Sequence, residues 1–385
     1  MNDPLKSCRL RLRQWQNDRR LHRERDYYNT LFRQRNLSIP DDDVLRADLK
    51  KIFPGIVPKS KGQLNIVAIY RHYNWENYSL KPALEKFGTV LHYDWGAHFN
   101  VSAKSWRRSV KAQMNRALLE TVQSWAVKDR PDIIFMYVSG EVIEPDVLAA
   151  LRAHGAPLVN LALNDKEHFV GKIRAGRAFG AKDICRYFDL SWTSTEDALA
   201  KYVVEGANPL YLPEGANPDI HKPYDVDRTI DVSFVGQRYG NRQAVIDELT
   251  RRGIVVEAYG FGWPRGPLSI EEMVRLYSQS RINLGFGGVE GHRDTYCLKG
   301  RDFEIPMSGG LYLTEDHHEL YHAFRPGKEI LTYTGIDDLE QKIRYYLAHP
   351  DKADAVRKKG FERARQEHTW EARFNKIFDL PGLLR

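Results

Sequence analysis

The sequence predicts an α/β protein that contains two doubly wound parallel sheets with a crevice between them. The chain has 385 residues, more than one ordinary domain usually holds. Short apolar runs rich in β-branched residues alternate with segments of helical composition, and this alternation occurs twice. Each predicted strand is apolar along almost its whole length, which is typical of parallel sheets covered by helices on both faces.

A basic segment precedes the first alternation. Residues 1–60 hold 14 Lys/Arg against 8 Asp/Glu, so they carry +6 of the net charge of +7. Residues 5–35 lack Gly and Pro and predict a helix, and residues 36–62 predict a linker with a short helix near 41–51. The extension 1–62 could contact an anionic membrane surface, nucleic acid or another protomer, or it could be a solvated helical extension.

The cysteines and the hydropathy indicate the cellular compartment in which the protein is expected. Cys8, Cys185 and Cys297 are far apart and lack metal-ligand spacing, which favours a reducing environment. The first residues have no apolar core of a secretory signal, and no run of 18 apolar residues occurs. The cytoplasm is the expected location, and the basic segment allows a peripheral position at the inner membrane face.

The first predicted domain covers residues 63–213. Helices are expected at 77–87, 106–127 and 145–154, with another beginning at 193–196. The predicted strands are 64–70, 89–94, 132–138, 157–163 and 189–192. Residues 214–228 contain two prolines and a glycine and predict an interdomain connection.

The second predicted domain covers residues 229–366. Its strands are expected at 230–235, 255–259, 282–286 and 329–333, with a further buried strand at the end of the segment 299–315. The predicted helices are 243–252, one capped by Ser269, 336–348 and 351–367. Residues 367–385 hold a last amphipathic helix around Trp370.

The loop from Gly236 to Arg242 follows a strand and opens a helix. Backbone N–H groups and a helix N-terminus favour an anion there, and Arg238 and Arg242 add cations suited to phosphate. The loop is neither a full G-x-G-x-x-G nor a P-loop, which disfavours a hydride-transfer cofactor or an ATPase. Tyr259 and the Gly/aromatic loop after it suit a flat base slot. Both loops could also be ordinary turns.

The segment 299–315 carries two cations and a carboxylate within six residues. Lys299 and Arg301 could hold phosphates, and Glu304 could accept hydrogen bonds from a sugar diol. Gly287 belongs to the flexible loop before this segment, and Gly309 to the tight turn inside it. The alternative is a surface ion-pair cluster beside an ordinary strand.

Asp165 and His168 follow the fourth strand of the first domain. They are the candidate catalytic residues, because either could bind a sugar hydroxyl or orient an acceptor, although a lone His after a strand is more often structural. No zinc spacing, no G-x-S-x-G and no Asp-x-Asp at a strand end occurs, so no metal site is expected.

Residues 297–315, together with 212–218, 231–242 and 277–284, resemble CgeB-like, spore maturation protein-like glycosyltransferases. These are relatives of the retaining glycosyl transferases group 1, and the resemblance covers roughly residues 64–380. It implies a GT-B architecture of two Rossmann-like domains facing a crevice. The second domain would bind a nucleotide-sugar donor and the first an acceptor, and the helix around Trp370 would cross back to the first domain.

The resemblance also implies roles for single residues. Arg238 and Lys299 resemble the phosphate-neutralising pair of the family, and Arg301 is a further candidate. Many relatives carry a Glu, seven residues and a second Glu; Glu304 matches the second, which binds the donor ribose, whereas Tyr296 stands in place of the first.

The expected activity is hexosyl or related glycosyl transfer with retention, without metal or cofactor. The acceptor is open among a glycan, a lipid-linked glycan, a protein and modified nucleic acid. Two alternatives are a GT-B-fold nucleotide-sugar epimerase and a non-catalytic nucleotide- or glycan-binding protein.

Overall fold

The computed structural model describes residues 4–73 and 75–385, so the first three residues of the predicted extension lie outside the described residues. The chain divides into two compact units. The first sheet unit comprises Arg23–Pro213 and Glu371–Arg385. The second sheet unit comprises Met1–His22 and Glu214–Trp370.

The first sheet unit contains a six-stranded parallel sheet of order β2-β1-β3-β4-β7-β8. Its strands are β1 Leu64–Tyr70, β2 Gly88–Tyr93, β3 Ile133–Tyr137, β4 Leu158–Ala162, β7 Leu190–Thr193 and β8 Pro209–Tyr211. A short antiparallel pair lies outside it, β5 Ile173–Arg174 with β6 Arg177–Ala178. The strand order reverses between β1 and β3.

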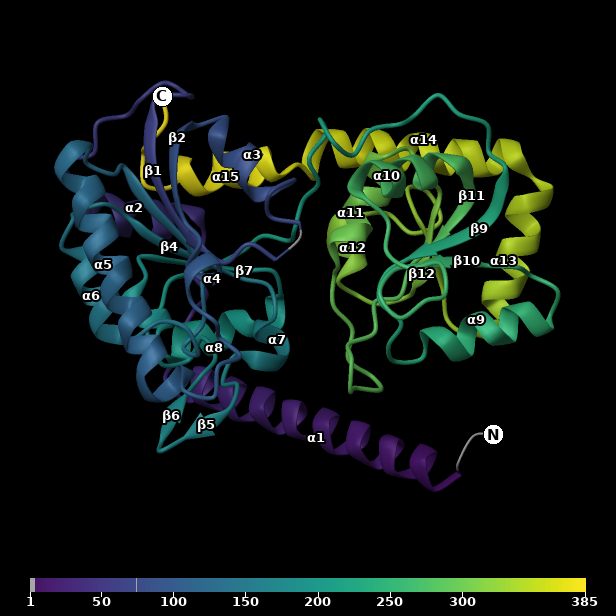
Figure 1. The fold of residues 1–385 in the computed structure, drawn as a ribbon, viewed down its shortest axis with the longest axis horizontal. Helices are drawn as coiled ribbons and strands as arrows, with labels where there is room; N and C mark the ends of the chain where they lie inside the picture. The colour runs from purple at the N-terminus through teal and green to yellow at the C-terminus, as the bar shows by residue number, and fades with distance from the viewer. Residues whose placement is uncertain (1–3, 74) are drawn as a thin grey trace. The chain divides into compact units, whose positions relative to one another are not determined.

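Helices cover both faces of this sheet. Ile134 and Met136 lie in one core cluster with residues of α5 (Lys111–Lys128) and α6 (Pro145–Arg152), which run side by side (Figure 1). The intervening Phe135 contacts Phe374 of α15 (Trp370–Asp379), with ring centroids 5.3 Å apart. Since successive side chains of a strand point to opposite faces, α15 covers the face opposite α5.

The remaining helical segments of the first sheet unit are short. The predicted helix 77–87 is reduced to α3, and the predicted helix 106–127 begins as the π-helix η1 before α5. The short helical segments are α3 Leu80–Glu85, α4 Trp95–His98, η1 Trp106–Val110, α7 Asp165–His168, η2 Cys185–Tyr187, η3 Glu196–Ala198 and α8 Leu199–Val204.

The second sheet unit contains a five-stranded parallel sheet of order β10-β9-β11-β12-β13. Its strands are β9 Ile230–Val235, β10 Glu257–Tyr259, β11 Ser280–Leu284, β12 Tyr312–Glu315 and β13 Leu331–Tyr333. Its helices are α9 Arg242–Arg251, α10 Ile270–Gln279, α11 Gly300–Met307, α12 Leu320–Ala323, α13 Ile336–Ala348 and α14 Pro350–Glu367. The order reverses between β9 and β11, as it does between β1 and β3.

Two core clusters lie in this unit. One joins α9 and α13 to β9 and β11, and the other joins α10, α11 and α12 to β12 (Figure 1). The capping box predicted at Ser269 is present, because its hydroxyl accepts from Glu272 N at 3.3 Å and Glu272 Oε2 accepts from Ser269 N at 2.8 Å. Two doubly wound parallel sheets are therefore confirmed.

The predicted N-terminal helices are also present, as α1 Pro4–Gln34 and α2 Asp42–Ile52. Asp41 caps α2 by accepting from Val44 N at 2.9 Å. The division between the units falls within α1. Among the described residues, no helix combines the length and the apolar character needed to cross a membrane.

Candidate functional site

The reversal of strand order in the second sheet unit places loops around one point. β9 and β11 are neighbours, but the chain leaves them toward different helices, α9 and α11. In open α/β sheets, ligands bind in the crevice that such a divergence opens at the carboxyl ends of the strands. The residues just beyond Val235 and Leu284 are therefore where a ligand is expected.

Arg301 lies at this point. Its Nη1 donates to Phe286 O at 3.4 Å, and its guanidinium is 5.4 Å from the ring centroid of Phe234. A Cβ on Gly236 would lie 2.7 Å from Arg301 Nη2, so only a glycine leaves room for the guanidinium. Burial works to lower the pKa of Arg301, but nearby ionisable groups, led by Tyr312, raise it overall.

Lys299 is the residue before the first turn of α11. Its backbone N donates to Asp302 Oδ2 at 2.6 Å, which fixes the start of the helix. Its Nζ lies 2.7 Å from Cys297 Sγ, and this neighbour outweighs burial and raises the pKa of Lys299. Two cations and a helix N-terminus thus meet in one place, which favours a multiply charged anion such as a diphosphate.

Asp302 holds the start of α11 from inside. It is fully buried, accepts a hydrogen bond from the hydroxyl of Tyr312, and has its pKa raised to about 6 by burial. The sequence predicted the two cations that precede Asp302 but not this support.

Two carboxylates converge beside the cations. A Cβ on Gly300 would lie 3.2 Å from Glu304 Oε1 and 3.4 Å from Glu214 Oε2. Burial, followed by the charge of Glu304, raises the pKa of Glu214 to about 8. With its pKa raised in this way, Glu214 holds its proton at neutral pH and can donate a hydrogen bond.

His221 lies beside Glu304. Its Nδ1 accepts from Asn217 N at 3.3 Å, and burial lowers its pKa, so the ring is neutral and its proton lies on Nε2. That atom is 3.7 Å from Glu304 Oε1. Glu214 and His221 belong to the predicted connection 214–228, so the sequence missed both, although Glu214 lies in the resemblance segment 212–218.

Arg238, expected to pair with Lys299 at the phosphates, contacts the loop after β10. Its Nη1 donates to Gly262 O at 3.2 Å, and its guanidinium is 5.7 Å from the ring centroid of Trp263. The side chain is exposed. It remains available to a ligand at the edge of this site.

Arg242 differs from the expected phosphate contact. It is 2% exposed, donates to Gln237 O and Tyr239 Oη at 2.8 Å each, and stacks 3.8 Å from the Tyr239 ring centroid. Burial and the nearby charge of Arg301 lower its pKa to about 10. Arg242 therefore braces the loop after β9 from inside the fold.

Tyr259 and Gly309 also hold the backbone in place. Tyr259 O accepts from Gly236 N at 2.9 Å, and its hydroxyl donates to Glu257 Oε2 at 2.9 Å. Gly309 has φ +70° just after α11, and a Cβ there would lie 3.0 Å from Pro223 Cγ, so it ends the helix. These contacts give both residues structural roles, and their expected ligand contacts stay predictions.

Gly287 and Tyr296 lie at the base of a loop between β11 and α11. Gly287 O accepts from Cys297 N at 3.1 Å, and a Cβ on Gly287 would lie 2.9 Å from the ring of His317. The Tyr296 ring is stacked on His317, with centroids 5.7 Å apart and planes 12° from parallel. An aromatic stack therefore occupies the position where the resembled enzymes carry an acid.

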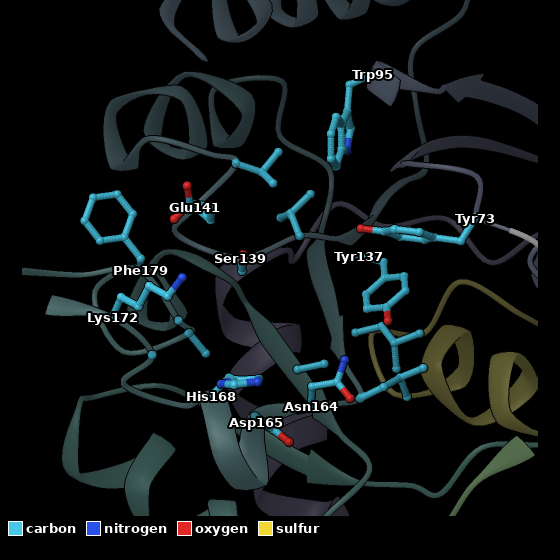
Figure 2. Close-up of a pocket in the computed structure, with 18 of the residues that line it drawn as sticks. Tyr73, Trp95, Tyr137, Ser139, Glu141, Asn164, Asp165, His168, Lys172 and Phe179 are labelled. Carbon is cyan, nitrogen blue, oxygen red and sulfur yellow. The ribbon is translucent and has the colours of Figure 1, made fainter. Parts of the chain in front are cut away.

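The first sheet unit has a cavity of about 470 Å³ at the carboxyl ends of β1, β3 and β4, where its own strand order reverses. Figure 2 shows aromatic residues on opposite sides of it, with His168 between them. The side chains that line it include Tyr73, Trp95, Arg107, Tyr137, Glu141, Asn164, Asp165, His168, Lys172 and Phe179.

The structure separates the two predicted residues of this cavity. His168 is exposed along its wall, with 63% of the side chain accessible. Asp165 is buried, accepts from Tyr202 Oη at 2.9 Å, and has its pKa raised to about 6 by burial. Asp165 therefore supports the short helix α7, whereas His168 faces the cavity. Tyr137 was not predicted as part of the wall of this cavity, although its position at the end of a predicted strand could have indicated it.

Comparisons with known proteins show two kinds of similarity, one in sequence and one in fold. Residues 238–379 match the family described as "Glycosyl transferase-like". A search of curated protein sequences gives no significant match.

Solved structures share the fold at low sequence identity. Sucrose-phosphate synthase from Thermosynechococcus elongatus matches with a TM-score of 0.57 and 12% identity over 82% of this chain and 98% of that chain. A glycosyltransferase from Rickettsia africae matches with a TM-score of 0.58 and 11% identity, covering 83% and 98%. HepE from Anabaena in complex with UDP matches with a TM-score of 0.54 and 10% identity, covering 82% and 99%. The chain thus has two Rossmann-like units of the GT-B fold class, with a glycosyl transferase-like region in the second.

Proposed function

We propose that this protein transfers a sugar from a nucleotide-diphosphate sugar to an acceptor. The second sheet unit binds the donor and the cavity of the first sheet unit binds the acceptor. One observation carries the proposal: Lys299, Arg301, the start of α11 and the Glu214–Glu304 pair meet at the strand-order reversal. Most of these residues lie inside the region that matches the glycosyl transferase-like family.

The chemistry of donor cleavage suits this arrangement. When the glycosidic bond to the donor breaks, negative charge develops on the departing diphosphate, and fixed cations stabilise it without having to reorganise. Lys299 and Arg301 supply this charge, and we propose that transfer needs no metal ion. Glu304, which has His221 beside it, accepts from the ribose hydroxyls.

Uracil is the base we propose first. HepE, which shares the fold, has been solved with UDP and with UDP-glucose. Calorimetric titration of the full chain with UDP, GDP, ADP and dTDP tests this, and UDP is expected to bind most tightly. If none of the four binds, the donor site is wrong. Turnover of the bound donor is then followed by mass spectrometry with a panel of acceptors, and the anomeric form of the product checks the retention that the resemblance predicts.

The roles of the two units can be tested separately. His168→Ala should lower transfer to the acceptor by about tenfold, in the range of a lost acceptor contact or acid–base group, and leave UDP affinity unchanged. His154→Ala is the matched control, because His154 lies in the turn before β4, at the opposite edge of the same sheet. Equal transfer rates in both variants would remove His168 from the proposed acceptor site. Donor binding without any turnover would favour the non-catalytic alternative, for which Tyr296 is the motivating difference.

A further inference from the structure

The loop between β11 and α11 folds back on itself as a hairpin. Gly288 and Tyr296 form an antiparallel bridge, and Val289 N donates to Thr295 O at 2.9 Å. Three residues after Tyr296, the chain reaches Lys299. The shape of this hairpin, residues 287–297, therefore determines where the start of α11 and its cations lie.

The tip of the hairpin is held by a residue from far away in the sequence. Asp18 of α1 accepts three hydrogen bonds at 2.8 Å each, from His292 Nδ1, Arg293 N and Thr295 Oγ1. Next to it, Asn17 Nδ2 donates to Gly291 O at 2.8 Å. Four hydrogen bonds from two adjacent helix residues thus hold the tip of the hairpin.

The Asp18 carboxylate is built into this contact. Only 5% of the residue is exposed, and the His292 side chain is equally buried. Burial alone raises a carboxyl pKa, but the hydrogen bonds from Arg293, Thr295 and His292 lower the pKa of Asp18 overall. A buried carboxylate with three donors is a specific anchor, because an amide or an alkyl group in its place leaves buried donors without an acceptor.

We infer that Asp18 is a positioning residue for the donor site: by anchoring the hairpin tip, it holds Lys299 and the start of α11 in the conformation that binds the diphosphate. Resting on the proposed function, this role goes beyond it by assigning part of the N-terminal helix to donor binding. The hydrogen bonds of Asp18 described above involve neither the cations nor the carboxylate pair.

Asp18→Asn tests this inference in the full chain, because it keeps the shape and removes the charge. Asp26→Asn is the matched control, since Asp26 is an exposed acid of the same helix. We expect the dissociation constant for UDP and the KM for the sugar donor to rise about tenfold in Asp18→Asn, the factor that corresponds to losing about one hydrogen bond to a charged group. The kcat at saturating donor should stay within about twofold, because an unchanged kcat with a raised KM marks a loss of binding. Asp26→Asn should change neither.

Cleavage by trypsin after Arg293 provides a second readout that does not depend on activity. The Arg293 side chain is 75% exposed, so cleavage there is limited by opening of the hairpin. Mass spectrometry should show faster cleavage at this bond in Asp18→Asn than in Asp26→Asn. Thr295→Val removes one of the three donors and should give the same changes at smaller size, should Asp18→Asn fail to fold.

The outcomes separate the two claims. The positioning role would be overturned if Asp18→Asn had the same UDP affinity and cleavage rate as the natural chain. If only Thr295→Val folds, the same result in that variant would overturn it. In either case the donor site would remain intact. A natural chain that binds no nucleoside diphosphate would overturn the proposed function, and the positioning role with it.

Discussion

Replacing Glu214 by Gln should make the stability of the protein less dependent on pH. In the folded chain the pKa of Glu214 is raised from 4.5 to about 8 by burial and by Glu304. Between these values the folded state keeps the proton that the unfolded state has lost, so the stability of the natural chain falls as pH rises from about 4.5 to 8. Glu214→Gln cannot titrate and escapes this loss.

The full shift corresponds to about 5 kcal/mol at 1.36 kcal/mol per pH unit. Because the Glu214 side chain keeps some contact with solvent, we expect about 2–3 kcal/mol. The free energy of unfolding in urea should be measured at pH 5 and pH 8 for the natural chain, Glu214→Gln and the exposed control Glu362→Gln. The stability of Glu214→Gln relative to the natural chain should rise by this amount between the two pH values, and that of the control should not. A difference that stays constant with pH would refute the raised pKa of Glu214.

Two further predictions follow from the described contacts. Lys299→Met should weaken UDP binding by about 10- to 100-fold, because it removes a hydrogen bond to a charged group. The control Lys352→Met removes an exposed charge of the same unit and should leave UDP binding unchanged. Equal affinities of the two variants in calorimetry would remove Lys299 from the donor site. Phe374→Ala should lower the free energy of unfolding by about 3–5 kcal/mol, because its buried ring fills the space between α15 and the first sheet. The control is Phe261→Ala, which removes an exposed ring. A loss under about 1 kcal/mol in urea, comparable to that of the control, would contradict this packing.

The fold was largely predictable because its signal is local. Apolar runs such as 64–70 and 230–235 are buried strands wherever they occur, and their alternation with helices leaves few topologies. The errors lie at element ends. The predicted strand 255–259 loses its first two residues because Val255 is exposed, and helix 77–87 contracts to Leu80–Glu85.

The candidate site was predictable only where its residues are neighbours in the sequence. Lys299, Arg301 and Glu304 were recognised together because one helix start carries them. Glu214 reaches the same place through tertiary structure from about 85 residues upstream, and no local pattern marks it. Arg242 shows the converse, because composition does not distinguish an arginine stacked on Tyr239 inside the fold from one that faces a ligand.

Hydrogen–deuterium exchange with and without saturating UDP tests the central claim most directly. We predict slower exchange in peptides that cover residues 236–242 and 297–304, where the backbone N–H groups and the cations would contact the diphosphate. Protection of the loop after β9 and of the start of α11 together would support the donor site. Protection confined to the cavity of the first sheet unit, or none despite saturable binding, would contradict it.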